Sequence, residues 1–93
     1  MKLVYAQEAK TRIRALSPDI KKGIKESLEK LAKDPYLGKP LQRELIGFWT
    51  LAFKRYRIIY KLDSSKIHLN IYTIGRRENI YEDFTQKVKM SSI

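Results

Sequence analysis

The chain contains no cysteine among its 93 residues, so neither a disulfide framework nor a thiolate zinc site is possible. His68 is the only histidine, and the acidic residues show no paired arrangement suited to metal binding or glycoside chemistry. No glycine-rich phosphate loop or serine triad is present either. We therefore expect neither a metal nor another cofactor, and the enzyme classes that need these motifs are excluded.

Long hydrophobic runs are also missing. No segment approaches the roughly 20 apolar residues that span a bilayer, and the N-terminus has no long apolar run after Lys2. The sequence therefore predicts neither a signal peptide nor a membrane partner. Because the chain has no internal repeat and no low-complexity segment, its length predicts one domain over residues 1–93.

Positive charge is the strongest global feature of the chain. Its 20 Lys and Arg residues exceed its 10 Asp and Glu residues, which gives a net charge of +10. Such an excess in a small domain favours a polyanionic partner, namely a nucleic acid, an anionic membrane surface or an acidic protein. The membrane surface is set aside, because the apolar stripe of the second helix is better spent on the core than on a bilayer. The alternative is that the basic residues only keep the surface soluble.

The first third of the chain predicts a strand followed by two helices. Lys2–Ala6 carries apolar residues on both faces, which indicates a strand inside a sheet. Apolar residues then recur at helical spacing from Glu8 to Leu16. A second helix begins at Ser17-Pro18, with the serine as N-cap, and ends at Asp34-Pro35. We expect the two helices to form an antiparallel hairpin.

The rest of the chain predicts a loop and a three-stranded antiparallel meander. Residues 35–40 form the expected crossing loop, and one helical turn fits within residues 41–46. A turn at Lys54-Arg55 places Ala52 opposite Arg57, and a turn at residues 63–66 places Arg57 opposite Tyr72. Both registers predict one apolar face for the helices to cover and one polar, basic and partly aromatic face.

These elements together predict an α+β fold. An N-terminal strand and a helical hairpin precede the meander, which completes a four-stranded sheet. Apolar residues in a charged context after Gly75 predict a short C-terminal helix near residues 82–88, or a tail.

Four motifs in this order resemble those of one protein family. They are Gly38-Lys39-Pro40-Leu41, the stretch Leu45-Ile46-Gly47-Phe48-Trp49-Thr50-Leu51, the stretch Tyr56-Arg57-Ile58-Ile59-Tyr60, and Ile74-Gly75-Arg76-Arg77 through Tyr81. With its length and predicted order of elements, nearly the whole chain resembles the RelE/ParE superfamily of type II toxin–antitoxin toxins. The resemblance implies a RelE-like fold and a small cytoplasmic toxin that a co-expressed antitoxin binds and neutralises.

The resemblance also implies candidate catalytic residues. Arg57 matches the arginine of the family's YR-hydrophobic-hydrophobic-Y motif, and Arg77 matches the arginine after the strand-ending glycine. Tyr81 matches the tyrosine that RelE-like nucleases use in their chemistry. RelE-like enzymes usually carry Lys or Arg on the strand before the YR motif, and the matching positions here are Phe48, Thr50 and Ala52.

RNA cleavage without a metal explains why these residue types suit such a site. The 2′-OH attacks the adjacent phosphate, so a base, cations for the developing phosphorane charge and an acid for the leaving 5′-oxygen are needed. Arginine can hold phosphate oxygens with two parallel hydrogen bonds, and tyrosine can stack on a base or carry a proton. The expected RNA-binding side chains are Lys54, Arg55, Lys61, Tyr72 and Arg76.

A plain surface role is the alternative for each of these side chains, and Tyr81 can equally close the sheet as a hydrophobic residue. His68 and Asn70 are expected to be exposed strand residues.

The resemblance leaves two activities open. RelE-like members cleave mRNA in the ribosomal A site, which predicts a metal-independent endoribonuclease that inhibits translation, with ribosome and mRNA as partners. ParE-like members poison DNA gyrase, which predicts a toxin that binds a protein without hydrolysis. A cognate antitoxin is the expected partner in both cases.

Overall fold

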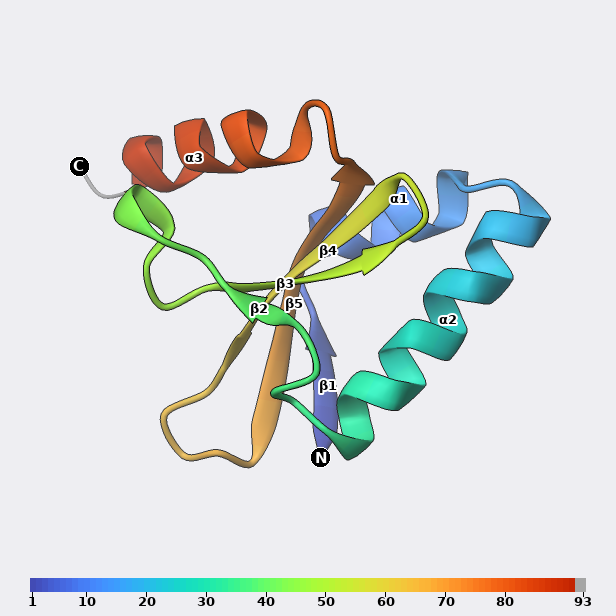
Figure 1. The fold of residues 1–93 in the computed structure, drawn as a ribbon, viewed down its shortest axis with the longest axis horizontal. Coiled ribbons are helices and arrows are strands. Elements are labelled where there is room, and N and C mark those ends of the chain that lie inside the picture. The colour runs from blue at the N-terminus through green and yellow to red at the C-terminus, as the bar shows by residue number, and fades with distance from the viewer. Residues whose placement is uncertain (92–93) are drawn as a thin grey trace.

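The computed structural model describes residues 1–91, which form one twisted sheet with helices on both of its faces (Figure 1). The sheet has five strands in the order β1-β5-β4-β3-β2. The strands are β1 (Lys2–Tyr5), β2 (Lys39–Pro40), β3 (Trp49–Phe53), β4 (Tyr56–Leu62) and β5 (His68–Arg76). The helices are α1 (Gln7–Ala15), α2 (Pro18–Lys33), the 3-10 helix η1 (Arg43–Leu45) and α3 (Ile80–Ser91).

The predicted α+β fold is confirmed, with one strand more than expected. The additional strand is β2, which pairs with β3 at the edge of the sheet within the segment predicted to be a loop. Two residues are too few to show the alternation that identifies a strand. Pro40 lacks a backbone N–H, and proline in a sheet is confined to such edges.

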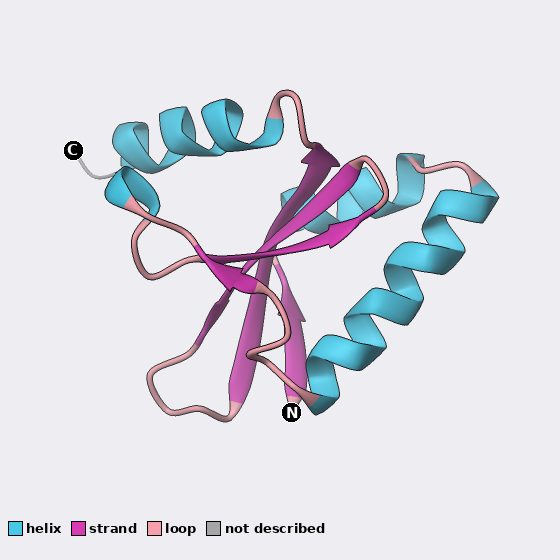
Figure 2. Cartoon of the chain, in the orientation of Figure 1, coloured by secondary structure: helices cyan, strands magenta, loops and turns pink. Residues whose placement is uncertain are grey.

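The helical hairpin covers one face of the sheet, as expected (Figure 2). Pro18 occupies the first turn of α2, and Ser17 precedes it with extended backbone but makes no side-chain capping bond. The apolar stripe of α2 is buried against the central strands β4 and β5. The buried residues of this first core cluster are Ala9, Ile24, Leu28, Leu31, Ile58, Tyr60, Leu69, Ile71 and Ile74.

Strand β1 lies at an edge of the sheet, so its predicted place inside the sheet is wrong. It pairs in parallel with β5 and has no strand on its other side in the described sheet. Its two faces differ, because Val4 is 41% exposed whereas Leu3 packs against the first core cluster. The helical hairpin and strands β2 to β4 lie between β1 and β5 in the sequence, although β1 and β5 are neighbours in the sheet.

The register between β3 and β4 is confirmed, because Ala52 lies opposite Arg57. The predicted register between β4 and β5 is wrong, since Arg57 lies opposite Gly75 and not opposite Tyr72. This error matters for function, because it had placed an aromatic residue beside the candidate catalytic arginine.

Two local features cause the difference in register. The β4–β5 connection pairs Leu62 directly with Leu69. A β-bulge then shifts the pairing between Ile59 and Tyr60, which leaves Tyr72 without a partner on β4. An inserted residue of this kind reverses which face the following side chains occupy, and alternation in the sequence does not show where it falls.

The half of the second face beneath α3 is apolar and aromatic, so the prediction of a polar, basic and partly aromatic face is wrong about the polarity of this half. Helix α3 is longer than the predicted 82–88 segment and lies across the face (Figure 1). A second core cluster forms beneath it, with Leu45, Ile59, Ile80 and Phe84 buried and Phe48 and Tyr72 packed against them. None of the helices among the described residues is long and apolar enough to cross a membrane.

Candidate functional site

The part of the second face that α3 leaves open forms a cleft of about 350 Å³. The edge strand β2, strand β3, the start of β4 and the first turn of α3 enclose it. Its polar lining side chains are Lys39, Thr50, Arg57 and Tyr81. Among the described residues, the lining contains no carboxylate and no imidazole, so its charged side chains are all positive.

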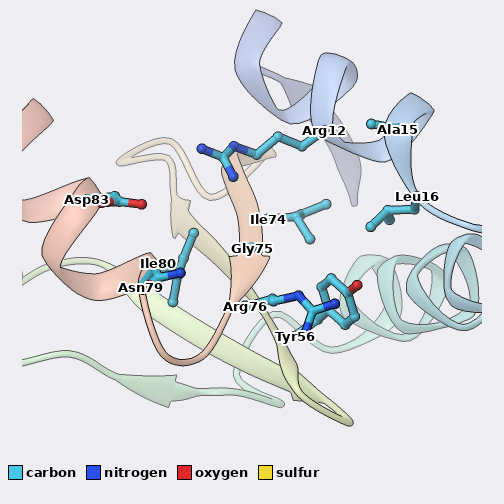
Figure 3. Close-up of a pocket in the computed structure, with 10 residues that line it drawn as sticks. All are labelled: Arg12, Ala15, Leu16, Tyr56, Ile74, Gly75, Arg76, Asn79, Ile80 and Asp83. Carbon is cyan, nitrogen blue, oxygen red and sulfur yellow. The ribbon is translucent and has the colours of Figure 1, made fainter.

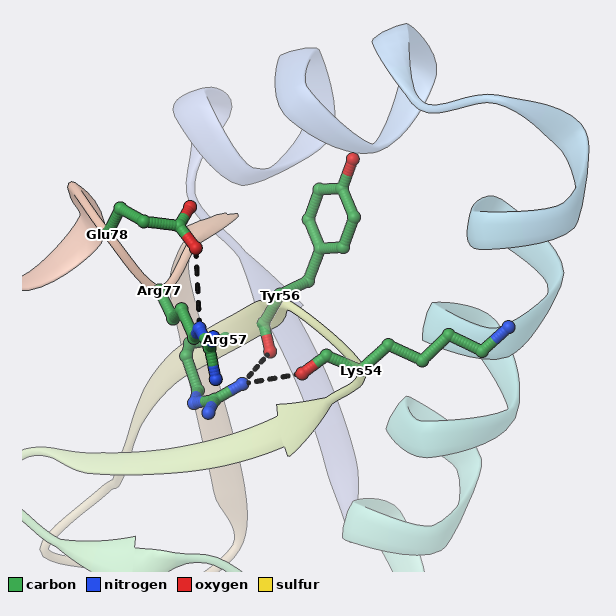
Figure 4. Close-up of polar contacts among 5 residues, drawn as sticks. All are labelled: Lys54, Tyr56, Arg57, Arg77 and Glu78. Carbon is green, nitrogen blue, oxygen red and sulfur yellow. Dashed lines mark hydrogen bonds and ion pairs between the residues drawn. The ribbon is translucent and has the colours of Figure 1, made fainter.

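Arg57 is held rigidly at one end of this cleft. Its Nη1 donates hydrogen bonds to the backbone carbonyls of Lys54 at 2.9 Å and Tyr56 at 2.8 Å (Figure 4). Lys54 has a φ of 52°, which is the left-handed conformation that a two-residue hairpin turn requires. Because both bonds use one nitrogen of a five-donor group, the other N–H groups of Arg57 are left for a ligand.

Tyr81 enters the cleft from the first turn of α3. Its hydroxyl lies 3.2 Å from Thr50 Oγ1, and either oxygen can be the donor. Thr50 stands on β3, 31 residues earlier in the chain, so the contact joins the terminal helix to the sheet. The hydrogen bond holds a phenol that can give or take a proton in the same cleft as Arg57.

Arg77 lies at the same end of the sheet as Arg57 (Figure 4). Its backbone N–H donates to the carbonyl of Arg55 at 2.8 Å, which ties the end of β5 to the β3–β4 turn. Its side-chain Nε lies 3.3 Å from Oε1 of Glu78. The structure thus brings Arg57 and Tyr81 into one cleft and places Arg77 beside the turn that borders it.

Two residues predicted to bind RNA lie away from this cleft. Arg76 lies opposite Tyr56 on the face that carries the helical hairpin, and its Cζ is 5.7 Å from the centre of the Tyr56 ring. Tyr72, at the bulge, packs edge-on against Phe48 beneath α3. The predicted grouping of Arg57 with Tyr72 and Arg76 is therefore wrong, because the register and the bulge separate them.

The three basic residues on and beside β4 that were predicted to bind RNA are also absent from the lining of the cleft. Lys54 Nζ lies 5.6 Å from the centre of the Phe53 ring, and the side chain of Lys54 is directed toward the helical hairpin of α1 and α2 (Figure 4). Lys61 Nζ lies 5.1 Å from the centre of the Phe48 ring. Arg55 is exposed in the turn. None of the three belongs to the lining of the cleft.

Lys39 is the cleft residue that the sequence pattern missed. It lies directly opposite Thr50 in the β2–β3 pair, and residues opposite each other in an antiparallel pair point to the same face. Its cation therefore shares the cleft with Arg57. The Gly38-Lys39-Pro40-Leu41 motif was the one signal in the sequence that pointed to Lys39. A two-residue edge strand has no periodicity, so the sequence could not reveal that it pairs with β3.

A family model matches residues 3–81, which include all four polar residues of the cleft. The family is described as the ParE toxin of the type II toxin–antitoxin system parDE. The chain belongs to this family. Toxin RelG of Mycobacterium tuberculosis is 29% identical over 79 residues, which cover 83% of this chain and 91% of RelG.

Solved structures agree with the fold of this ParE-family protein. A chain of the toxin–antitoxin complex RelBE2 from Mycobacterium tuberculosis is similar with a TM-score of 0.74 and 27% identity, over 82% of this chain and 96% of that chain. The isolated E. coli RelE toxin has a TM-score of 0.70 at 16% identity, over 94% of this chain and 97% of that chain. At 16% identity this second likeness shows the fold alone.

The loop that brings Lys39 to the cleft is anchored by Tyr60 in this family member. The Tyr60 hydroxyl donates to the carbonyl of Pro35 at 3.0 Å and accepts the N–H of Gly38 at 3.0 Å. Burial raises the pKa of Tyr60, the Gly38 hydrogen bond lowers it, and the charge of Asp34 raises it, with a net upward shift. The neutral phenol is therefore the form that the folded state favours.

Replacing Tyr60 with phenylalanine is expected to lower the free energy of unfolding by about 1–3 kcal/mol, because a buried pair of hydrogen bonds loses its central hydroxyl. Since the folded pKa lies above the ordinary tyrosine value of about 10, the wild type should lose stability as the pH rises above 10. In Tyr60→Phe the loss of stability that comes from ionisation of Tyr60 should disappear. Burial also raises the pKa of Tyr5, so the loss that comes from Tyr5 should remain. Urea unfolding at several alkaline pH values measures both effects, and equal pH slopes in the two proteins would contradict the assignment.

Proposed function

We propose that this protein is a toxin that cleaves mRNA on the ribosome and that a cognate antitoxin neutralises it. The observation that carries the proposal is the cleft, where Lys39, Arg57 and Tyr81 converge from three separate elements. Two cations beside a phenol fit a phosphodiester better than a neutral substrate.

The cleft residues can divide the cleavage reaction among them. The 2′-oxygen of the substrate forms a bond to phosphorus, the bond from phosphorus to the 5′-oxygen breaks, and the products are a 2′,3′-cyclic phosphate and a 5′-hydroxyl. Arg57 and Lys39 stabilise the extra negative charge on the phosphorane oxygens. Tyr81 gives its proton to the departing 5′-oxygen, and Arg77 binds a neighbouring phosphate.

The proton of the 2′-OH passes to water or to a group of the ribosome, because the described lining offers no carboxylate or imidazole as a base. A cleft that lacks this group depends on its surroundings to orient and activate the substrate. This incompleteness supports cleavage on the ribosome, where mRNA is held in place, over cleavage of free RNA.

The antitoxin partner is proposed from the similarity to toxin–antitoxin complexes, including RelBE2 from Mycobacterium tuberculosis. An acidic protein is the expected binder, because the chain has a net charge of +10. A small acidic protein encoded beside this chain would be the candidate.

Induced expression in a bacterial host, followed by primer extension on abundant mRNAs, tests the proposed function. We expect translation to stop and new 5′ ends to appear inside translated codons. A copy of the same mRNA with its start codon removed is the matched control, since it is not translated and should stay intact. Intact reporter mRNA in growth-arrested cells would overturn the proposal.

Poisoning of DNA gyrase is the second candidate, and two observations favour it. The matching family is described as the ParE toxin, and β3 carries Thr50 and Ala52 where a RelE-like nuclease usually has cations. In this case purified gyrase should accumulate cleaved DNA when the protein is added. Changes in the helical hairpin, such as Arg14→Ala, should then weaken toxicity more than Arg57→Ala does.

Lys39→Ala is expected to slow mRNA cleavage about 10- to 100-fold, because a charge-assisted contact to phosphate is lost. Ala52 also lines the cleft and makes no contact to Tyr81 that the structure records, so a lysine there can place its ammonium group in the same cleft. We therefore expect the double variant Lys39→Ala/Ala52→Lys to regain much of the rate. Cleavage in a purified translation system measures the effect, with Lys30→Ala on α2 as the charge-matched control; full activity of Lys39→Ala would contradict it.

A further inference from the structure

The backbone that carries Tyr81 is fixed by its neighbours in the chain. Ile80 begins α3 and is 2% exposed, and Tyr81 follows it directly. Figure 3 shows Ile80 beside Gly75 near the end of β5, so close that a Cβ atom on Gly75 would lie 2.7 Å from Ile80 Cδ1. The N–H of Asn79 donates to the carbonyl of Arg76 at 3.1 Å, which closes the turn between β5 and α3. Rotations of the Tyr81 side chain therefore decide where its hydroxyl lies.

Thr50 holds that hydroxyl in place. Its Oγ1 lies 3.2 Å from the Tyr81 hydroxyl, and this is the one hydrogen bond recorded for the Tyr81 phenol among the described residues. Thr50 is itself held within the sheet, because it pairs with Lys39 of β2 on one side and with Ile59 of β4 on the other. Threonine is branched at Cβ and has few side-chain rotamers, so its hydroxyl is a stiff partner. The direction of the phenol is thus set from the sheet.

The proposed reaction requires Thr50 to be the donor of this hydrogen bond. Tyr81 gives its proton to the departing 5′-oxygen, so that proton must point at the substrate and not at Thr50. A hydroxyl can donate and accept, so Thr50 can give its own proton to a hydrogen bond with the phenol oxygen. As the proton leaves Tyr81, negative charge grows on that oxygen, and a hydrogen bond to a charged acceptor is stronger than one to a neutral acceptor. The contact therefore strengthens toward the transition state, which is the condition for it to raise the rate.

We propose that Thr50 is a positioning residue for the cleavage reaction, whose hydroxyl aims the phenol of Tyr81 at the departing 5′-oxygen and stabilises the phenolate that remains. The bond from phosphorus to the 5′-oxygen breaks, that oxygen takes the proton of Tyr81, and Tyr81 regains a proton from water after the product leaves. The inference rests on the proposed function, in which Tyr81 is the acid.

The alternative role for Thr50 is to tie α3 to the sheet. Other contacts already do this, because Phe84 of α3 is buried in one cluster with Ile59 of β4. Lys87 of α3 also forms an ion pair with Glu8 of α1. One partly buried hydrogen bond between neutral groups adds about 1 kcal/mol to these contacts. Removal of the Thr50 hydroxyl should therefore leave the helix in place and free the phenol to rotate.

Replacement of Thr50 tests the inference in a purified translation system with a synthetic mRNA on the ribosome. Thr50→Val removes the hydroxyl and keeps the branched shape, and we expect kcat to fall about tenfold with KM unchanged, because the hydrogen bond to the developing phenolate is lost. Thr50→Ser keeps the hydroxyl and should retain most of the rate. Thr73→Val is the matched control, since Thr73 Oγ1 on β5 is buried without a hydrogen-bond partner in the described chain and lies outside the cleft lining.

An mRNA with sulfur in place of the departing 5′-oxygen separates this role from a structural one. A thiolate is a weaker base than an alkoxide and leaves without a proton, so its departure does not need Tyr81. We expect the wild type, Thr50→Val and Tyr81→Phe to cleave the sulfur mRNA within about twofold of one another, because the other cleft residues are intact. On the oxygen mRNA, Thr50→Val/Tyr81→Phe should be no slower than Tyr81→Phe, since both changes remove one function.

Three results would overturn the inference. They are a wild-type rate of Thr50→Val on the oxygen mRNA, equal slowing of this variant on both mRNAs, and additive losses in the double variant. Thermal unfolding of each variant identifies a folding defect, and Thr50→Ala gives the same comparison if Thr50→Val does not fold. Failure of the proposed function would appear separately, because the wild-type protein would then cleave neither mRNA.

Discussion

Replacing Arg57 with alanine is expected to slow mRNA cleavage about 10²–10³-fold, because a fixed cation no longer faces the charge that develops on phosphorus. The two backbone bonds that orient the guanidinium make its loss more costly than the loss of a mobile surface arginine. Cleavage of a translated mRNA by purified ribosomes and purified protein measures the rate. Arg57→Lys should recover little, since an ammonium group lacks the planar fork.

Arg14→Ala is the matched control for this prediction. Arg14 is exposed on α1, so its removal changes the net charge equally without touching the cleft. Thermal unfolding of each variant separates a folding defect from a catalytic one, since Arg57 also holds the β3–β4 turn. If Arg57→Ala unfolds at a lower temperature but cleaves mRNA at the wild-type rate, Arg57 is structural and the proposed chemistry fails.

Replacing Gly38 with alanine is expected to lower the free energy of unfolding by about 1–3 kcal/mol, as overpacking of a tight contact does. A Cβ atom at this position would overlap the carbonyl oxygen of Thr50 and the hydroxyl of Tyr60, so the loop must move away from the sheet. Movement of the loop also displaces Lys39, which follows directly. We therefore expect cleavage to fall by a factor similar to that of Lys39→Ala.

Urea unfolding and the cleavage assay together test this prediction. Ile46→Ala is the control in the neighbouring connection, because Ile46 is 73% exposed, lies outside the lining of the cleft, and the change removes atoms without creating overlap. The double variant Gly38→Ala/Tyr60→Phe should cost less than the sum of its single changes, since both disturb the Gly38–Tyr60 contact. Wild-type stability of Gly38→Ala would contradict the packing described at the β2–β3 edge.

The basic residues at the end of β5 lie in different surroundings. Arg76 and Arg77 are neighbours in the chain, yet Arg76 stacks on Tyr56 on the face that carries the helical hairpin, whereas Arg77 lies beside the turn that Arg57 holds. Neighbours in the sequence therefore need not belong to one site.

Local patterns in the sequence determined most of the elements and the register of half of the central meander. Helical spacing, Ser17-Pro18 and Asp34-Pro35 were enough to predict α1 and α2, because those signals act within a few residues of the positions they specify. The register of β3 against β4 followed for the same reason, since a two-residue turn leaves no freedom in the pairing. Arg57, Arg77 and Tyr81 were found by matching sequence motifs, in the order in which they occur, to those of a family. Such a match needs no knowledge of distances in the folded chain.

Only the tertiary structure decided which of these residues meet. The bulge at Tyr72 depends on how β4 and β5 pack, and it moved Tyr72 and Arg76 away from Arg57. The two-residue strand β2 exists because Tyr60 and Thr50 hold its loop against the edge of β3, and it brings Lys39 into the cleft. Helix α3 covers half of the second face because Ile59 and Phe84 bury each other's apolar surface across 25 residues of sequence. Contacts between distant segments have no local signature, so the composition of the cleft emerged only from the folded chain.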